Sequence, residues 1–474
     1  MDQPPHGGRS DSVVAPAHAL DAGHTAAEIG RSFRLRDALS CPGVQTPNGP
    51  DTCVTLGKVL PKEFRLDPDF RKLWIGQAIS QIGSNITAVA LPLTAVLVLK
   101  ASPLQMGFLS GAGAAAVLIF GLFAGAWVDR LRRRPILIGA DLGRAVVLGI
   151  IPLAAMLHRL TIGDLYLVAV ASSTLTVLFD VSYQAYLPSL IERENILAGN
   201  SRLALTESIA QVAGPGIAGT LVQLITAPMA MLFDALSFVC SAISVWRIRQ
   251  REPVPTRTLQ PHIGREISEG LGASWRHPLL RALAARSATS AFFLGFGSSL
   301  YFLFAMRELG LTAAVLGIII AIGGTSGLFG AFLAEWLVRR FGFGRTFIGS
   351  AVAIGIAMLL VPLAHGSVAV CSAFLIAAQL GDLAWPVYTI SERSLRQAIT
   401  PDRLLGRVNS SMHLLFHGVL PLGALAGGAL AQAMGVRPAL LIGAIGVLLS
   451  TMCLVFSPIR RLRQLSHAVE EIRA

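Results

Sequence analysis

The chain has 474 residues, of which 53% are hydrophobic and only 14% are charged, and its mean hydropathy is +0.63. Soluble domains carry about 25% charged residues, so this composition excludes an ordinary soluble protein and indicates a membrane protein. The net charge of +12 is also found in nucleic-acid-binding proteins, but here the basic residues fall in short connections between apolar stretches, so we expect no nucleic-acid partner.

The N-terminal region, 1–65, differs from everything that follows it. It is rich in Pro, Gly, His and Ser and contains no long apolar stretch. Its start, MDQPPHGGRS, lacks the basic and apolar regions of a signal peptide. We therefore expect a disordered cytoplasmic tail.

Apolar stretches long enough to cross a bilayer follow one another from residue 72 to residue 457. A hydrocarbon core of about 30 Å requires roughly 20 residues of helix. Backbone groups in lipid must be hydrogen-bonded within the segment, which favours helices over the short alternating strands of a barrel. The sequence predicts an all-α integral membrane protein with twelve transmembrane helices, near 72–99, 104–127, 135–157, 163–188, 203–225, 228–247, 280–306, 312–337, 345–364, 367–390, 405–433 and 436–457.

The connections between these helices alternate in charge. Those after every second helix, and the C-terminal segment, hold several Lys or Arg residues, whereas those on the other side hold one or none. Basic connections stay in the cytoplasm, where anionic lipids attract them. We expect a multi-pass protein of the cytoplasmic membrane with both termini cytoplasmic.

The longest internal connection, 248–279, divides the chain into two six-helix halves. Within it, Ile267, Leu271 and Trp275 follow one another at four-residue spacing and form one apolar helix face. This pattern predicts an amphipathic helix on the membrane surface, and an ordinary linker helix is compatible with it. The predicted domains are a tail, an N-terminal half, a linker, a C-terminal half and a cytoplasmic C-terminal tail, at 1–65, 66–247, 248–279, 280–458 and 459–474.

The two halves are related in sequence. The segment 107–139 aligns without gaps to 317–349. Parallel repeats of this kind indicate a transporter whose binding site lies between the halves, near the middle of the membrane. The aligned identities include Gly107 with Gly317 and Gly139 with Gly349, and a second echo pairs Asp180 with Asp382 and Tyr186 with Tyr388.

A charged turn, GAWVDRLRRRP, separates the second and third predicted helices. Twelve spans in two repeats, with this turn, resemble the major facilitator superfamily, whose signature is roughly G-x-x-x-D-R-x-G-R-R. Arg132 replaces the second glycine of that pattern. The stretches 70–93, 213–219, 269–283 and 401–411 are similar to the enterobactin-exporter and macrolide-efflux branch. The residues that match the signature are Gly125, Asp129, Arg130, Arg133 and Arg134.

The resemblance implies a gating role for this turn. In the family the turn ties the cytoplasmic helix ends together in the outward-facing state, and Asp129 would face the positive end of a helix. The alternative is that the arginines only fix the topology. We favour the gate because an acid is placed among them.

Three acids inside the predicted spans, Asp180, Glu207 and Asp382, are candidates for proton coupling. A charge at this depth costs at least about 2.5–3.5 kcal/mol, so each is expected to have a function or a partner. The alternative for all three is a structural ion pair or hydrogen bond. For Asp141 and Arg144, which are three residues apart on one helix, we expect the structural pair.

Polar residues mark the first predicted helix and glycines mark the fifth. Gln77, Gln81 and Asn85 form a polar stripe that lines the substrate cavity or holds helices together; we favour the cavity. The AGPGIAG stretch resembles the antiporter motif of the superfamily, and its glycines and proline permit close packing and a bend. The residues of this helix-bend motif are Gly214, Pro215 and Gly219.

No catalytic constellation is present in the sequence. HLLFH (413–417) lacks the Glu of a zinc-protease helix, and there is no phosphate-binding GxxxxGK[ST] loop and no nucleophile elbow. We therefore expect no enzyme activity, no catalytic residues, no metal and no cofactor.

The resulting hypothesis is a monomeric secondary active transporter that exports a small molecule by alternating access, driven by the proton gradient. The branch suggests siderophores, antibiotics or other secondary metabolites as substrates. An importer of the same fold, and a membrane sensor or assembly subunit that moves nothing, remain as alternatives.

Overall fold

The computed structural model describes residues 67–128, 131–191, 195–250 and 263–462. These belong to one compact unit that begins at Phe64. The predicted tail 1–65 lies outside the described residues, as does most of 459–474. In the described ranges, twelve helical segments are long and apolar enough to cross a membrane, as predicted.

The first half contains six helices, each forming one span. They are α1 (Pro68–Leu93, extended by a π-helical turn at Thr94–Val98), α2 (Pro103–Val128), α3 (Arg133–Met156), α4 (Ile162–Leu190), α5 (Ile196–Ile225) and α6 (Ala227–Trp246).

The second half follows the linker helix α7 (Ile263–Arg276). One span is interrupted by a short 3-10 turn at Gly381–Leu383, which joins α11 to α12, and the last span combines α14 with α15. The helices are α8 (Pro278–Leu303, extended by a π-helical turn at Phe304–Glu308), α9 (Ala313–Phe341), α10 (Phe343–Leu363), α11 (Val368–Leu380), α12 (Ala384–Ile399), α13 (Asp402–Met434), α14 (Val436–Ser450) and α15 (Met452–Val455).

Local sequence signals explain several of the helix ends. Thr161 and Asp164 form a capping box at the start of α4, and the Ser367 hydroxyl accepts a hydrogen bond from the Val370 amide at the start of α11. Gly342 and Gly435 have φ angles of 85° and 96° and separate consecutive helices with a single residue. A side chain is rarely tolerated at such angles, which is why glycine makes these turns.

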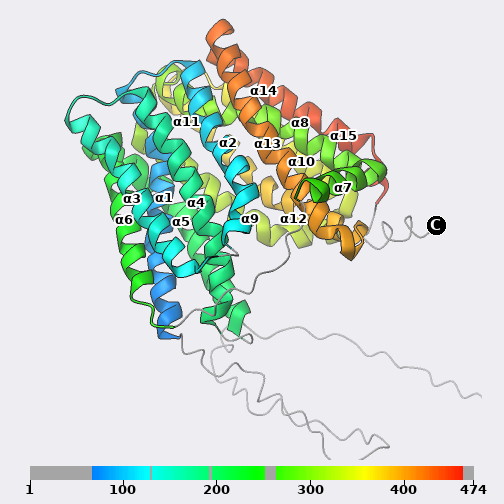
Figure 1. Cartoon of the computed structure of the whole chain (residues 1–474). Helices are drawn as coiled ribbons and strands as arrows, with labels where there is room; N and C mark the ends of the chain where they lie inside the picture. Colours follow the sequence, from blue (N-terminus) through cyan, green and yellow to red (C-terminus); the bar gives the residue numbers. More distant parts are fainter. Residues whose placement is uncertain (1–66, 129–130, 192–194, 251–262, 463–474) are drawn as a thin grey trace, which may run out of the picture. The chain divides into compact units, whose positions relative to one another are not determined.

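The most extensive packing between the halves is that of α2 with α13 and of α5 with α9, and α8 also packs against α2 (Figure 1). In each of the first two pairs, glycines let the backbones approach closely. A β-carbon on Gly107 would lie 3.1 Å from the α-carbon of Gly428, and one on Gly219 would lie 2.9 Å from the α-carbon of Gly317. The two contacts obey the predicted repeat, in which Gly107 corresponds to Gly317.

These glycine contacts lie at one end of the helices, which we call the packed end; it carries the connections at 99–102, 226, 309–312 and 435. A single apolar core there combines both halves, with Ala101 and Ala218 from the first and Leu311 and Ala431 from the second. The opposite end, which carries the α2–α3, α4–α5, α9–α10 and α12–α13 connections, is here called the basic end.

Two helices extend further than hydropathy predicts. We expected connections at 189–202 and 391–404, but α5 begins at Ile196 and α12 continues to Ile399. Both extensions are amphipathic rather than uniformly apolar. Hydropathy marks the part of a helix that faces lipid, so it misses turns whose charged side chains face the protein interior.

The linker contains the predicted helix, α7. Gly270 and the buried Ser274 are four residues apart, and α7 packs against α13, where a β-carbon on Gly270 would meet the Arg407 carbonyl. Trp275, on the predicted apolar face, is 61% exposed. The side chain of Ile267 lies outside the described residues. One face of α7 thus packs against the bundle, and its position on the membrane surface stays a prediction.

Candidate functional site

A cavity of about 980 Å³ lies between the two halves, toward the basic end. Ligand pockets for drug-sized molecules are roughly 300–1,000 Å³, so the cavity is large enough for a substantial organic molecule. Its walls come from α2 and α4 of the first half and from α8, α12 and α13 of the second. The polar and aromatic residues that line it are Asp180, Gln184, Arg286, Ser287, Ser290, Trp385, Tyr388, Thr389, Glu392, Arg393, Arg396, Gln397, Asn409, Ser410, His413, Phe416 and His417.

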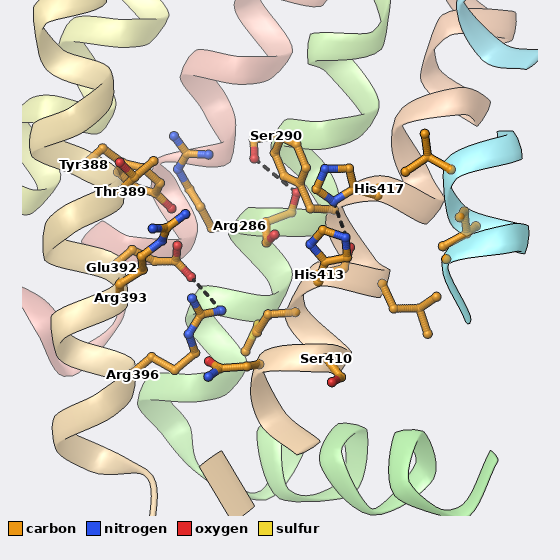
Figure 2. A pocket seen from close by; sticks show the side chains of 18 of the residues that line it. Arg286, Ser290, Tyr388, Thr389, Glu392, Arg393, Arg396, Ser410, His413 and His417 are labelled. Atoms are coloured by element: carbon orange, nitrogen blue, oxygen red, sulfur yellow. Dashed lines mark hydrogen bonds and ion pairs between the residues drawn. The ribbon is translucent and has the colours of Figure 1, made fainter. Parts of the chain in front are cut away.

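Most charged residues of the cavity belong to the wall formed by the second half (Figure 2), and Asp180 faces them from the first half. Glu392 and Arg396, one turn apart on α12, form an ion pair of 3.4 Å. The guanidinium carbon of Arg286, on α8, lies 4.7 Å from the centre of the Tyr388 ring. Sequence reasoning missed these residues. Glu392 and Arg396 fell in a supposed connection. Arg286 lay inside the predicted span 280–306, a signal that we followed for the acids and for Arg144 but not for Arg286.

The two histidines of HLLFH also line this cavity. Their rings stack with centres 3.9 Å apart, as Figure 2 shows, and the Nδ1 atom of His417 lies 3.2 Å from the His413 carbonyl oxygen. Over the described ranges, no group of three or more potential metal ligands occurs. The pair therefore contributes flat ring surface and hydrogen-bonding nitrogens to the wall.

A second cavity, of about 250 Å³, lies within the first half and brings several predicted residues together. Gln77 and Gln81 of α1 meet Asp180 of α4 and Glu207 of α5 there. Asp180 lines both cavities and so does its neighbour Gln184, one turn further along α4. The carboxylate of Asp180 is thus positioned where the polar pocket of the first half meets the large cavity.

Asn85, the third member of the polar stripe, has a different environment. Its amide nitrogen donates to the Gln81 carbonyl at 2.8 Å. A β-carbon on Gly214 would collide with Asn85, so α1 and α5 are in close contact at this level. Asn85 does not line either cavity described above and instead lies at a helix–helix contact, the alternative considered for the whole stripe.

The AGPGIAG stretch lies where α5 crosses α9. Pro215 is inside α5, and its carbonyl would be met by a β-carbon on Gly317. Gly214 and Gly219 present bare backbone to α1 and α9, respectively. Gly219 therefore brings helices of different halves together at the packed end, whereas Gly214 packs α5 against α1 within the first half.

Asp382 is separated from the other two candidate acids. It lies in the 3-10 turn between α11 and α12, where a β-carbon on Gly323 of α9 would be 2.7 Å from one of its carboxylate oxygens. Asp382 does not line the large cavity or the smaller one. The structure thus brings Asp180 and Glu207 to one pocket and leaves Asp382 in the second half.

Part of the predicted gating turn is described. Arg133 and Arg134 open α3, and Gly125 lies in the last turns of α2. Arg134 donates to the carbonyl oxygens of Val245 at 3.3 Å and Trp246 at 2.5 Å. These bonds connect the start of α3 to the carbonyl end of α6, where positive charge is favourable. Asp129 and Arg130 lie outside the described residues.

Three further charged residues are buried inside the first half. Arg144 forms the predicted ion pair with Asp141, and its guanidinium carbon is 4.4 Å from the Phe179 ring centre and 4.0 Å from that of Phe238. Asp234 accepts hydrogen bonds from Thr87 at 2.5 Å and from Ser237 at 3.1 Å. These groups have partners within the half and hold α1, α3, α4 and α6 together.

Comparison with known proteins adds to this geometry. A family model described as a transmembrane secretion effector matches residues 64–471. The multidrug efflux pump Tap of Mycolicibacterium fortuitum is 28% identical over 404 residues, which are 81% of this chain and 94% of the pump. Macrolide efflux protein A of Streptococcus pyogenes is 24% identical over 83% of this chain and 97% of its own length.

Solved structures share the fold. A bacterial homologue of the iron transporter ferroportin, in an inward-facing state, superposes with a TM-score of 0.68 at 20% identity, over 82% of this chain and 98% of the homologue. The nucleoside transporter NupG superposes with a TM-score of 0.65 at 13% identity, over 82% of this chain and 98% of its own. At these identities the similarity concerns the fold alone.

Proposed function

Because this chain belongs to the transmembrane secretion effector family of the major facilitator superfamily, we propose that it exports a small organic molecule across the cytoplasmic membrane by alternating access, driven by protons. The observation that carries the proposal is the cavity of about 980 Å³ between the halves, hollow toward the basic end and backed by the packed end.

The orientation of the chain in the membrane determines the side to which the cavity opens. The positive-inside rule assigns the basic end to the cytoplasm, so the cavity takes its substrate from inside the cell. The glycine contacts at Gly107–Gly428 and Gly219–Gly317 close the opposite end. Rocking of the halves would separate these contacts and present the same cavity to the outside.

Relatives support export as the direction. Both relatives named above are efflux proteins, one for multiple drugs and one for macrolides. The alignments span nearly the whole length of each, so the shared part includes both halves of the transporter. We propose a secondary metabolite or antibiotic as the exported class.

Asp180 is the acid we assign to proton coupling. It lines both the substrate cavity and the polar pocket that holds Glu207, Gln77 and Gln81. A carboxylate there can exchange a proton while substrate occupies the adjoining cavity, which is the arrangement that coupling requires. Asp382 lines neither cavity and is the second candidate for proton coupling.

Export can be tested in membrane vesicles from a host that expresses the full chain. Carboxyfluorescein and rhodamine 123, an anionic and a cationic dye on the same ring system, serve as probes. Everted vesicles expose the cytoplasmic face, so acidification of their lumen should drive accumulation of at least one dye, and a protonophore should abolish it. Vesicles without the chain are the control. Uptake confined to right-side-out vesicles would contradict export and favour the importer.

A further inference from the structure

We infer that the ligand of the large cavity is an organic anion whose negative group binds the guanidinium of Arg286. The inference rests on the proposed function only in so far as that ligand is the exported molecule. It extends the proposal by naming the charge of the substrate and the residue that recognises it.

Arg286 is a buried cation that forms no ion pair with any acid in the described part of the chain. It is 3% exposed and lines the cavity from α8. Its Nε atom has no hydrogen-bond partner, and no described carboxylate forms an ion pair with it. Its described close contact is the face of the Tyr388 ring, at 4.7 Å. A buried charge is costly unless it is paired and hydrogen-bonded, so this site is incomplete as it stands.

The neighbouring charged residues do not provide Arg286 with an ion-pair partner. Glu392 interacts with Arg286 electrostatically, but its carboxylate forms its ion pair with Arg396. Arg393 adds a further cation to the same wall. Three arginines against one glutamate give this wall a net charge of +2, and Asp180 on the wall of the first half brings the formal charge of the whole lining, with neutral histidines, to +1. An anion that enters the cavity is therefore attracted by the whole wall as well as by Arg286.

Arg144 is a buried structural arginine of the same chain and serves as a comparison for Arg286. It is also 3% exposed, and it too lies over aromatic rings, those of Phe179 and Phe238. Unlike Arg286, it forms an ion pair with a buried acid, Asp141, one turn away. A buried arginine that opens onto a cavity and lacks such an acid is arranged to receive its partner from outside the chain.

The surroundings of Arg286 indicate the rest of the ligand. Phe416 and the stacked rings of His413 and His417 line the cavity, as Figure 2 shows for the histidines, whereas the Tyr388 ring is stacked with Phe347 and lies beneath the Arg286 guanidinium. The planar guanidinium of arginine binds a carboxylate with two parallel hydrogen bonds. The site therefore suits an amphipathic acid, with a carboxylate on Arg286 and an apolar ring system against the aromatic residues.

Equilibrium binding to the purified full chain in lipid nanodiscs tests this directly. Fluorescence polarisation gives the Kd of carboxyfluorescein and of rhodamine 123, whose shared ring system isolates the effect of charge. The wild-type chain should bind the anion more tightly. Arg286→Gln should weaken anion binding at least tenfold and change cation binding less than twofold. Arg281→Gln, an exposed arginine on the same helix, is the matched control and should change neither.

Arg286→Lys separates recognition from folding. It keeps the charge but loses the bidentate geometry, so it should retain a preference for the anion with a weaker Kd. If thermal unfolding shows that Arg286→Gln does not fold, the Kd values of Arg286→Lys test the inference in its place. Equal loss of both dyes in the Arg286 variants would assign the residue a merely structural role and overturn the inference. The inference would also be overturned if the wild-type chain bound the anion no more tightly than the cation, or if it bound neither dye.

Binding needs no proton gradient, so the two proposals fail separately. A chain that prefers the anion in nanodiscs but moves neither dye in vesicles would retain the binding site and contradict export. A chain that exports rhodamine 123 and ignores carboxyfluorescein would retain export and overturn the anionic ligand.

Discussion

Gly219 of α5 and Gly317 of α9 approach so closely that a β-carbon built on either glycine would lie 2.9 Å from the α-carbon of the other. Gly107 and Gly428 make the corresponding contact between α2 and α13. Small residues permit such backbone approach between membrane helices, where packing rather than hydrophobicity drives association. The two contacts close one end of the molecule and leave the cavity at the other.

Gly317→Ala tests this closure. The added methyl group would meet the backbone of Gly219 and the carbonyl of Pro215, so α5 and α9 must separate. We expect a destabilisation of about 1–3 kcal/mol, typical of an overpacked contact, and increased labelling of cysteines introduced at the packed end. Thermal unfolding and labelling rates measure the two effects.

The matched control is Gly327→Ala on the same helix, where an added β-carbon would have no neighbour within 4 Å. Its stability and labelling should match those of the wild type. Identical behaviour of the two variants would show that the glycine contact does not hold the packed end closed.

Asp180→Asn should uncouple transport from protons. The substitution keeps the size of the side chain and removes the group that binds the proton, so export should lose its dependence on the pH gradient while downhill movement continues. Vesicle assays at several imposed gradients measure this. Glu335→Gln, an exposed acid of α9, is the control and should keep the dependence. Unchanged gradient dependence in Asp180→Asn would exclude this acid, and Asp382→Asn would then be tested in the same way.

Asp141→Ala should destabilise the first half. It leaves Arg144 buried without its acid, and the loss of one partner of a buried ion pair costs about 3–5 kcal/mol. The exposed pair of Glu335 and Arg339 is the comparison, because such pairs contribute only about 0–1 kcal/mol. Denaturation of the purified variants in detergent measures both. A similar small loss in Asp141→Ala and Glu335→Ala would argue against a structural role for the buried pair.

Asp129→Asn tests the gating turn that the family resemblance implies. We expect normal insertion and abundance, because the arginines that determine the topology remain, and loss of transport, because the acid that would hold the helix ends is neutralised. Immunoblots of membranes and dye export measure the two properties. Full transport by this variant would show that the turn determines only the topology and has no gating role.

Much of the fold follows from the sequence because its determinants are local or repeated. Apolar length predicts the twelve spans, and the aligned Gly107 and Gly317 lie at real crossings of helices, whereas β-carbons on the aligned Gly139 and Gly349 would meet nothing within 4 Å. Where helices end in polar turns, prediction failed: α12 continues to Ile399, and its last turns carry charged residues that line the cavity instead of an apolar surface that hydropathy would detect.

The site was harder to predict because it depends on how helices rotate against one another. Gln77, Gln81 and Asn85 lie on one helix face, but only the glutamines reach the polar pocket, since Asn85 meets Gly214. Arg286 was visible as a charge inside a predicted span, yet its lack of an ion-pair partner depends on its neighbours in space. A single sequence contains no such information.

The most direct test of export compares small molecules inside cells and in the medium, with the gene intact and with it deleted, under low iron and in stationary phase. The account predicts a compound that is retained inside the deletion strain and missing from its medium, and mass spectrometry of that compound would identify the substrate and its acidic group. A compound left unconsumed in the medium of the deletion strain would contradict export and make the protein an importer.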